Sequence, residues 1–340
     1  MDKRQQVIFK IMIMILLILI SIIATRGAIN IPVDKFGSVL IKSPDIPEVW
    51  LQVFWQIRFP KIVAAFLAGA SLSVCGLLMQ TFFRNPLADP FVLGVHSGSS
   101  LGVALWIMGT SYIPFLMNES IQNLGMVFFA ILGGVITLFL LLLLSKQIPG
   151  RSVLLVMGLV FGHFSSGIIN ILISVSDANK IKNFLLWTLG SFQRVSDDRL
   201  LIFSIVIIIG LMVSFIFKKD LNVMVLGERY SKSLGLSINR TKYFLICITA
   251  ILSGVVTAFC GPIVFIGIIT PHLFRKIIQS SDHTILLPGV ILLGGIIALF
   301  AELISSFHDG MIIPVNAVLG LLGVPVIIAF LWKNRKGEMG

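Results

Sequence analysis

The sequence predicts an all-α membrane protein with about ten transmembrane helices. Of its 340 residues, 57% are hydrophobic and 12% are charged, and the mean hydropathy is +1.02. Soluble domains are about half apolar and about a quarter charged, so this apolar surplus does not fit into one water-soluble core. The apolar residues also cluster in stretches of roughly 20, the length that a helix needs to cross a bilayer.

Ten apolar stretches are predicted to span the membrane. They are residues 7–27, 60–82, 92–109, 122–144, 152–174, 199–217, 242–260, 263–278, 285–304 and 314–332. The eighth stretch is short and interrupted. The first has a basic start like a signal peptide, but its apolar core is long and no clean small-x-small cleavage site follows. We therefore expect it to be an uncleaved first span.

The distribution of the basic residues predicts the orientation. The chain has 26 Lys and Arg residues and a net charge of +11. With a cytoplasmic N-terminus and ten spans, 17 of these basic residues lie inside and the other 9 lie outside, as the positive-inside rule expects. The sequence therefore predicts a multi-pass membrane protein with both termini cytoplasmic. The basic excess reports this orientation and not a nucleic-acid partner.

The connecting segments are consistent with a single domain over residues 1–340. The outer loop 28–57 contains a short amphipathic piece at 49–57, and the outer loop 175–198 is expected to carry a short surface helix. The inner segment 218–241 is longer than its neighbours and is expected to be structured. Three cysteines fall inside predicted spans, and no His, Cys or acidic spacing indicates a disulfide framework or a metal site.

The segment RNPLADPFVLG, residues 84–94, interrupts the apolar pattern after the second span. Pro86 and Pro90 remove hydrogen-bond donors and favour extended geometry in the residues before them. Asn85 and Asp89 are residue types that cap turns and helix starts. Within a bilayer, broken helices occur only where they pack in protein or face a water-filled cavity. We therefore expect a capped inner-side turn, with Gly94 opening the next span.

Small residues flank this segment. Ala65, Gly69 and Ser73 recur every four residues in the second span, a spacing that allows close helix packing in a bilayer. We expect neighbouring helices to enclose this span. In the fifth span Gly158, Gly162, Ser166 and Asn170 form one stripe, with His163 beside it. This stripe is consistent either with tight packing or with the wall of a central path, and Gln80 is a further candidate for such a path.

The chain also resembles two related halves. NPLADPFVLG follows the second span, and GPIVFIG, residues 261–267, follows the seventh. An odd number of spans, five, separates them, so the two copies would run in opposite directions through the membrane. Many transporters contain such inverted repeats. The matching stretch is short, and chance similarity is the alternative.

Six fragments in order carry a resemblance to a known family. They are IRFPK (57–61), GLLMQTFFRNPLADPFVLG (76–94), LGERYSKSLGL (226–236), FIGIITPH (265–272), LLPG (286–289) and VLGLLGVPVI (318–327). Together they resemble the FecCD/BtuC-like permease subunits of type II ABC importers, which take up ferric siderophores, haem and cobalamin. The resemblance covers roughly residues 50–335. It implies a ten-helix subunit of the bacterial cytoplasmic membrane that pairs with a second copy around a translocation path.

The resemblance also assigns a role to residues 218–241, the element that couples the permease to an ATPase. The residues themselves favour two short helices, one that runs from Glu228 to Gly235 and a second that Ser237 caps. Glu228 suits a helix start, Lys232 lies four residues later in the favourable ion-pair order, and Gly235 is placed to end the helix. An ordinary charged inner loop is the alternative. The expected ATPase contacts are Leu226, Gly227, Glu228, Leu234 and Gly235.

The resemblance implies further partners. The chain has no GxxxxGK[ST] motif, so ATP and Mg²⁺ are expected on separate ATPase subunits, with no cofactor and no metal bound by this subunit. A solute-binding protein is expected to dock at Arg58 and Lys61, where the family usually carries Arg-x-Pro-Arg. Lys61 replaces the second arginine and offers only a point charge. The expected loop and gate residues are Asn85, Pro86, Pro90, Gly94, Gly267 and Pro271.

Several questions stay open at this stage. An iron chelate is the expected cargo, with haem and cobalamin as alternatives. The partner permease is either a second copy or a related chain. A secondary transporter would commonly place ionisable residues at mid-membrane, and here only His163 does so. An intramembrane enzyme would need a nucleophile and base in convergence, and no such set is found.

Overall fold

The computed structural model describes residues 2–109, 119–147, 151–306 and 313–337, and all regular structure in them is helical. The elements are α1 Lys3–Thr25, α2 Val33–Leu40, α3 Glu48–Gln52, the π-helix η1 Val53–Arg58, α4 Phe59–Phe83, the 3₁₀ turn η2 Pro90–Leu93, α5 Val95–Gly109, α6 Glu119–Gln147, α7 Arg151–Ser174, α8 Ala178–Thr188, the 3₁₀ turn η5 Phe192–Arg194, α9 Asp197–Ile216, α10 Lys218–Val225, α11 Glu228–Ser233, α12 Ile238–Cys260, α13 Ile266–Ile278, α14 His283–Ser305 and α15 Val315–Gly337.

A helix lies at each of the ten predicted spans. In the part of the chain that the structure describes, seven helices are long and apolar enough to cross a membrane. Helices α5 and α13 have only 15 and 13 residues and begin about a turn later than predicted. Each starts directly after a residue with left-handed backbone, Gly94 at φ 72° and Phe265 at φ 71°. The two halves thus share a broken-helix entry, but Phe265, and not Gly267, matches Gly94.

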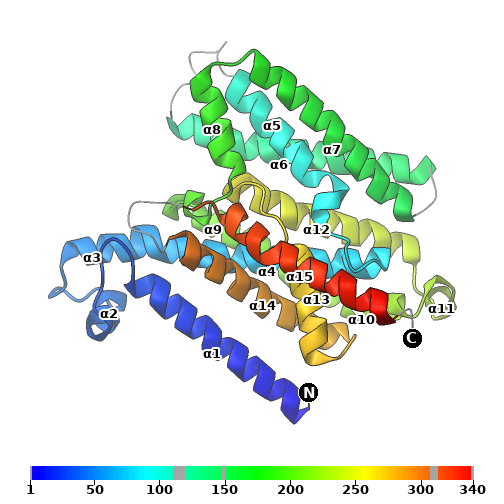
Figure 1. Cartoon of the computed structure of the whole chain (residues 1–340), viewed down its shortest axis with the longest axis horizontal. Coiled ribbons are helices and arrows are strands. Elements are labelled where there is room, and N and C mark those ends of the chain that lie inside the picture. The colour runs from blue at the N-terminus through cyan, green and yellow to red at the C-terminus, as the bar shows by residue number, and fades with distance from the viewer. Residues whose placement is uncertain (1, 110–118, 148–150, 307–312, 338–340) are drawn as a thin grey trace.

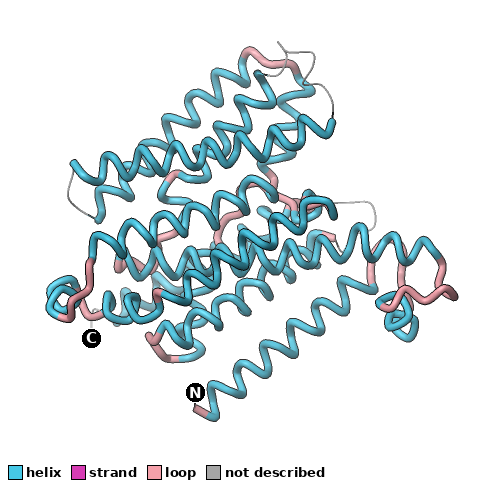
Figure 2. The backbone as a smooth tube through the Cα atoms, turned by 180° about the vertical axis from the view of Figure 1, so that it is seen from behind, coloured by secondary structure: helices cyan, strands magenta, loops and turns pink. Residues whose placement is uncertain are grey.

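The helices form two layers. Helices α5, α6, α7 and α8 lie together on one side, and the remaining long helices lie on the other (Figures 1 and 2). Helix α4 runs through the larger layer and packs against α9, α12, α13 and α14. Its apolar window is 89% buried, compared with 22% for α1, so the prediction that neighbours enclose the second span is confirmed.

The small-residue stripe of α4 is a helix crossing. A Cβ atom on Gly69 would lie 2.2 Å from the carbonyl oxygen of Gly294, and one on Gly294 would lie 2.4 Å from the carbonyl oxygen of Gly69. The α5–α6 pair uses the same device, because a Cβ on Gly98 would overlap Thr137. Close backbone approach gives helix pairs van der Waals contact that lipid does not provide.

This crossing predicts a strong effect of one added methyl group. Gly69→Ala forces the backbones of α4 and α14 apart, and overpacking of this kind costs about 1–3 kcal/mol. The matched control is Gly254→Ala in α12, where an added Cβ meets no atom within 4 Å. Because alanine favours a helix over glycine by about 1 kcal/mol, the control should be neutral or stabilising. Thermal unfolding in detergent measures both, and equal melting temperatures would contradict the crossing.

Candidate functional site

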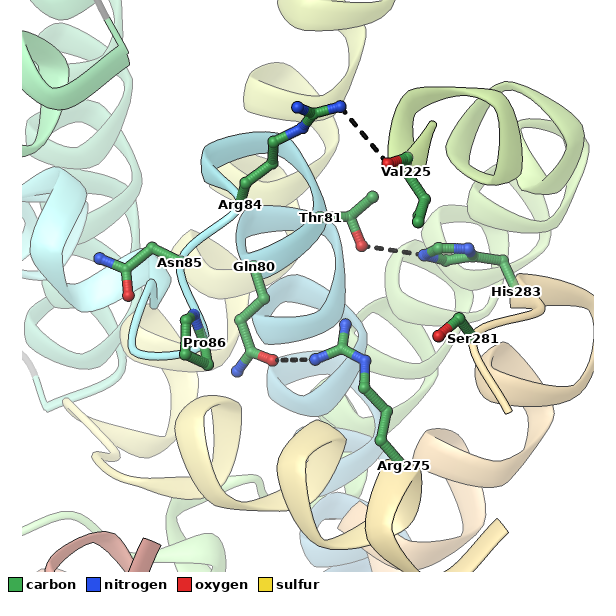
Figure 3. Close-up of a pocket in the computed structure, with 9 residues that line it drawn as sticks. All are labelled: Gln80, Thr81, Arg84, Asn85, Pro86, Val225, Arg275, Ser281 and His283. Atoms are coloured by element: carbon green, nitrogen blue, oxygen red, sulfur yellow. Dashed lines mark hydrogen bonds between the residues drawn. The ribbon is translucent and has the colours of Figure 1, made fainter. Parts of the chain in front are cut away.

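Four elements meet at one end of the bundle, called here the α10 end. They are the C-terminus of α4, the segment 84–94, helix α10 and the start of α14, with α13 alongside (Figure 3). Between them lies a cavity of about 360 Å³. It is lined by Gln80, Thr81, Arg84, Asn85, Pro86, Val225, Arg275, Ser281 and His283. The predicted residues Gln80, Asn85 and Pro86 are therefore brought together.

The segment 84–94 is a broken helix, as its prolines predict. Arg84 ends α4 with left-handed backbone at φ 51°. The Asn85 side-chain oxygen accepts a hydrogen bond from the Leu87 N–H at 3.0 Å, and Asp89 accepts one from the Phe91 N–H at 3.4 Å to start η2. The capping roles of both residues are thus confirmed.

The position of this segment differs from a simple inner-side turn. Ala88 and Asp89 are only 1% and 5% exposed, and Pro90 is buried as well. The chain therefore turns back into the protein before α5 begins. The reason is the room left by Gly267 in α13, where a Cβ atom would lie 2.8 Å from the Asp89 carboxylate. Burial raises the pKa of the Asp89 carboxyl well above its usual range.

Gln80 supplies a hydrogen-bond donor to α13 where a proline removes one. Pro271 lies inside that helix and has no N–H, so the carbonyl of Gly267, four residues earlier, lacks its helical donor. The Gln80 side-chain amide donates to the carbonyls of Gly267 at 3.2 Å and Ile268 at 3.3 Å. Its oxygen accepts from Arg275 at 2.7 Å. Gln80 thus joins α4 to α13, and Gly267 and Pro271 serve this joint inside a helix rather than in a loop.

A hydrogen-bond network ties α10 to the core. The His283 ring lies 2.8 Å from the Thr81 hydroxyl of α4 through Nε2, and 2.8 Å from the Asn222 side-chain oxygen of α10 through Nδ1. The same Asn222 oxygen accepts from the His283 backbone N–H at 2.7 Å, and the Asn222 amide donates to Asp282 at 2.7 Å. Asn222, His283 and Thr81 lie far apart in sequence, so spacing gave no signal for them.

A second tie runs through Arg84. Its guanidinium donates to the carbonyl of Met224 at 2.9 Å and approaches that of Val225 at 3.4 Å, at the C-terminal end of α10. Because Arg84 is the first residue of the segment 84–94, α10 is linked directly to the broken helix. Helix α10 therefore contacts both α4 and the start of the segment through side chains.

The predicted coupling segment contains two short helices, α10 and α11, and α11 is the predicted helix that starts at Glu228. The second predicted short helix is wrong, because Ser237 precedes the long helix α12. Gly227 at φ 115° separates α10 from α11, and Gly235 at φ 81° follows the end of α11, as predicted. Leu226 and Leu234 are 60% and 62% exposed, so this element presents apolar side chains outside the bundle. The Glu228 side chain, and with it the predicted pair with Lys232, lies outside the described residues.

A second cavity, of about 300 Å³, lies between the two layers. Its lining comprises Phe91, His96, Ser97, Ser100, Gly162, Ser165, Ser166, Ile169, Thr188, Pro262, Val264 and Asn316. Of the predicted path residues, Ser166 lines it, whereas His163 and Asn170 are exposed on α7 outside it. Gly158 instead packs against Gly94, where a Cβ would lie 2.9 Å from the Gly158 carbonyl oxygen.

Asn316 closes one side of this second cavity. Its side-chain amide donates to the carbonyls of Thr188 at 3.1 Å and Pro262 at 2.6 Å, and its oxygen accepts from the Val264 N–H at 3.4 Å. It therefore satisfies the irregular backbone before α13. The sequence analysis missed Asn316 because its partners lie 52 to 128 residues away.

Comparison with known proteins identifies the chain. The model of the FecCD transport family matches residues 13–333. The chain belongs to the FecCD transport family. It is 30% identical to the hemin transport system permease of Yersinia pestis, over 97% of this chain and 98% of that one. It is 32% identical to the vitamin B12 import system permease of Citrobacter koseri, over 83% of each chain.

A solved structure agrees with this assignment. It is described as an inward-facing conformation of a metal-chelate type ABC transporter, and it aligns with a TM-score of 0.83 and 27% identity, covering 96% of this chain and 99% of that one. The protein is thus a multi-pass ABC transporter permease of the FecCD family, as the six sequence fragments predicted.

The predicted docking residues lie at the opposite end of this FecCD-family permease. Arg58 is 5% exposed, and its guanidinium donates to the carbonyls of Ala24 at 2.7 Å and of Ile29. Lys61 is paired with Glu302 at 3.1 Å. Both side chains are thus engaged within the chain, because the carbonyls near the end of α1 need donors and the buried Glu302 needs a cation. Docking of a binding protein here stays a prediction.

The Lys61–Glu302 pair predicts a marked loss of stability when it is broken. Lys61→Met leaves the 5% exposed Glu302 carboxylate with only the Ser306 hydroxyl, at a cost of about 3 kcal/mol. The control is Lys180→Met, because its partner Asp177 is 82% exposed and such pairs contribute about 0–1 kcal/mol. Thermal unfolding tests both. The double change Lys61→Met with Glu302→Leu should restore stability, and no recovery would contradict the assignment.

Proposed function

We propose that this FecCD-family permease is the membrane subunit of an ATP-driven importer of an iron chelate, a ferric siderophore or haem. The complex would contain a second permease copy, two separate ATPase subunits that hold ATP and Mg²⁺, and an extracytoplasmic solute-binding protein. The subunit itself would bind no cofactor, and the α10 end would face the cytoplasm. Cobalamin is the alternative cargo, and a related permease is the alternative partner chain.

The observation that carries this proposal is the linkage between the exposed α10–α11 element and the broken helix. Leu226 and Leu234 offer apolar contacts to an ATPase groove. Asn222 and His283 connect α10 to α4, and Arg84 connects it to the first residue of the segment 84–94. Phe91 of the same segment lines the second cavity. A displacement of α10 would therefore be carried to the wall of that cavity.

The second cavity supports a weakly binding path for a large cargo. Its polar groups are mostly hydroxyls and one amide, and His96 is the one imidazole. Neutral groups of this kind contact a chelate without holding it tightly. The exposed α7 residues His163, Ser166 and Asn170, together with Gly167, which meets no atom within 4 Å of an added Cβ, are the proposed face toward the second permease copy.

Reconstitution tests the cargo. The permease, its ATPase and its binding protein in vesicles should accumulate one cargo among haemin, a ferric siderophore and cobalamin only when ATP is present. Uptake of cobalamin alone would select the alternative cargo. Uptake by the permease without ATPase and nucleotide would overturn the proposal in favour of a secondary transporter.

The docking role of the α10–α11 element predicts loss of ATPase binding on charge insertion. Leu226→Asp or Leu234→Asp places a carboxylate in an apolar contact, so the ATPase should no longer copurify with the permease. The control is Ile41→Asp, at a side chain that is 79% exposed in the opposite-end segment following α2. Retention of the ATPase by both leucine variants would show that the contact lies elsewhere.

The α10 linkage predicts uncoupling without disassembly. Asn222→Ala with His283→Leu removes hydrogen bonds worth about 1 kcal/mol each, so uptake per ATP hydrolysed should fall roughly tenfold. Lys219→Ala, on α10 outside the network, is the control. The measurement is the ratio of cargo moved to phosphate released, with copurification of the ATPase as the test of assembly. An unchanged ratio would remove this network from the coupling route.

A further inference from the structure

The cavity at the α10 end is rich in hydrogen-bond donors and has two cationic side chains. Arg275 from α13 directs its guanidinium into the space beside Gln80, and Arg84 lies on the other side, at the end of α4 (Figure 3). Asn85 and Ser281 add a side-chain amide and a hydroxyl to the lining. The proposed transport role assigns no ligand to this space.

Neither arginine has an acidic partner within the residues described. The ion pairs found there are Lys61–Glu302, Lys180–Asp177 and Arg199–Asp198. The acid next to the cavity in sequence, Asp282, accepts instead from the Asn222 amide and the Thr284 N–H, both at the start of α14. Among the residues that the structure describes, neither guanidinium is therefore paired with a carboxylate.

The contacts that the arginines do make use only part of their capacity. A guanidinium carries five N–H donors in a planar fork. Arg275 donates through Nη1 to Gln80, and Arg84 donates through Nη2 to the carbonyls of Met224 and Val225. All these acceptors are neutral. Arg275 is half-buried whereas Arg84 is exposed, so Arg275 gains the more free energy from an anion. The guanidinium fork matches phosphate oxygens in geometry.

Size and position indicate which anion. The cavity volume of about 360 Å³ exceeds what a single small ion needs and suits a phosphate with part of its ester. The cavity lies at the end of the bundle where α4 and α13 end and α14 begins, which is the predicted inner surface of the membrane. Basic pockets between transmembrane helices at this level bind the headgroups of anionic lipids.

We propose that this cavity binds a phosphate-bearing anion between Arg275 and Arg84, and that its source is the headgroup of an anionic phospholipid of the inner leaflet. The ligand supplies a counter-charge to the two guanidinium groups. It also bridges α13 and α4 at the point where Arg84 holds α10. The inference does not depend on the cargo or on ATP, so it is tested on the permease alone.

The test uses the purified full-length permease in a neutral detergent, and it records thermal unfolding against ligand concentration. The probes are dioctanoyl phosphatidylglycerol, dioctanoyl phosphatidylcholine and inorganic phosphate. Phosphatidylglycerol should raise the melting temperature saturably. Arg275→Gln and Arg84→Gln should each weaken the apparent Kd on the order of tenfold, because each removes a charge-assisted hydrogen bond. The control Arg240→Gln lies at the exposed start of α12, outside the cavity, and should respond like the wild type.

The outcomes distinguish a lipid headgroup from free phosphate as the ligand. A response to phosphatidylglycerol that the cavity variants lose supports the lipid headgroup. A saturable response to inorganic phosphate that competes with the lipid, with the same dependence on the two arginines, supports the phosphate site and assigns its ligand to solution. An equal response in all variants, an equal response to phosphatidylcholine, or no saturable response overturns the proposal.

A second variant covers the case in which loss of an arginine prevents folding. Ser281→Glu adds a carboxylate at the cavity wall and so supplies a counter-charge from the chain itself. It should raise the melting temperature without lipid and abolish the response to phosphatidylglycerol. An unchanged lipid response in Ser281→Glu would mean that the lipid binds elsewhere.

Discussion

Backbone groups within a bilayer have no water to pair with, so each break in a helix of this protein needs a partner from elsewhere in the chain. The segment 84–94 meets that need locally, through Asn85 and Asp89. At Pro271, Gln80 from α4 donates a hydrogen bond to the carbonyl that the proline leaves without a donor. Before α13, Asn316 from α15 forms hydrogen bonds with the irregular backbone. Each of these breaks is therefore stabilised by a polar side chain.

The helix crossings and the helix breaks differ in how easily they can rearrange. Helix crossings such as Gly69 on Gly294 have no room to adjust, because backbone lies against backbone. The joints at Gln80 and Asn316 depend instead on a few side-chain hydrogen bonds, each worth about 1 kcal/mol and able to change partner. The rigid crossings thus define bodies, and the breaks define where those bodies can move relative to each other.

Local features of the fold followed from the sequence, and distant pairings did not. Pro86, Pro90 and Gly94 act on their own backbone, so the break and its place in the sequence could be predicted. The stripe at Gly69 predicted a close crossing, but nothing in its spacing named α14 as the partner. For Arg58 the resemblance implied docking of a binding protein, and no local pattern indicated that it donates to the carbonyls of Ala24 and Ile29. Asn222 and His283 gave no local pattern at all.

The two ends of the bundle are held by different forces, and this difference indicates where motion begins. At the end away from α10, the buried Lys61–Glu302 pair and the buried Arg58 guanidinium fix α4 to α14 and to the end of α1 with charged groups. At the α10 end, Thr81, His283 and Asn222 form neutral contacts around an open cavity. The charged contacts there are made by the exposed Arg84 and the half-buried Arg275, which water reaches. Breaking a buried charged contact costs several kcal/mol, and exchanging a neutral hydrogen bond costs about one. A push applied to α10 would therefore open the weaker end while the other end acts as the hinge.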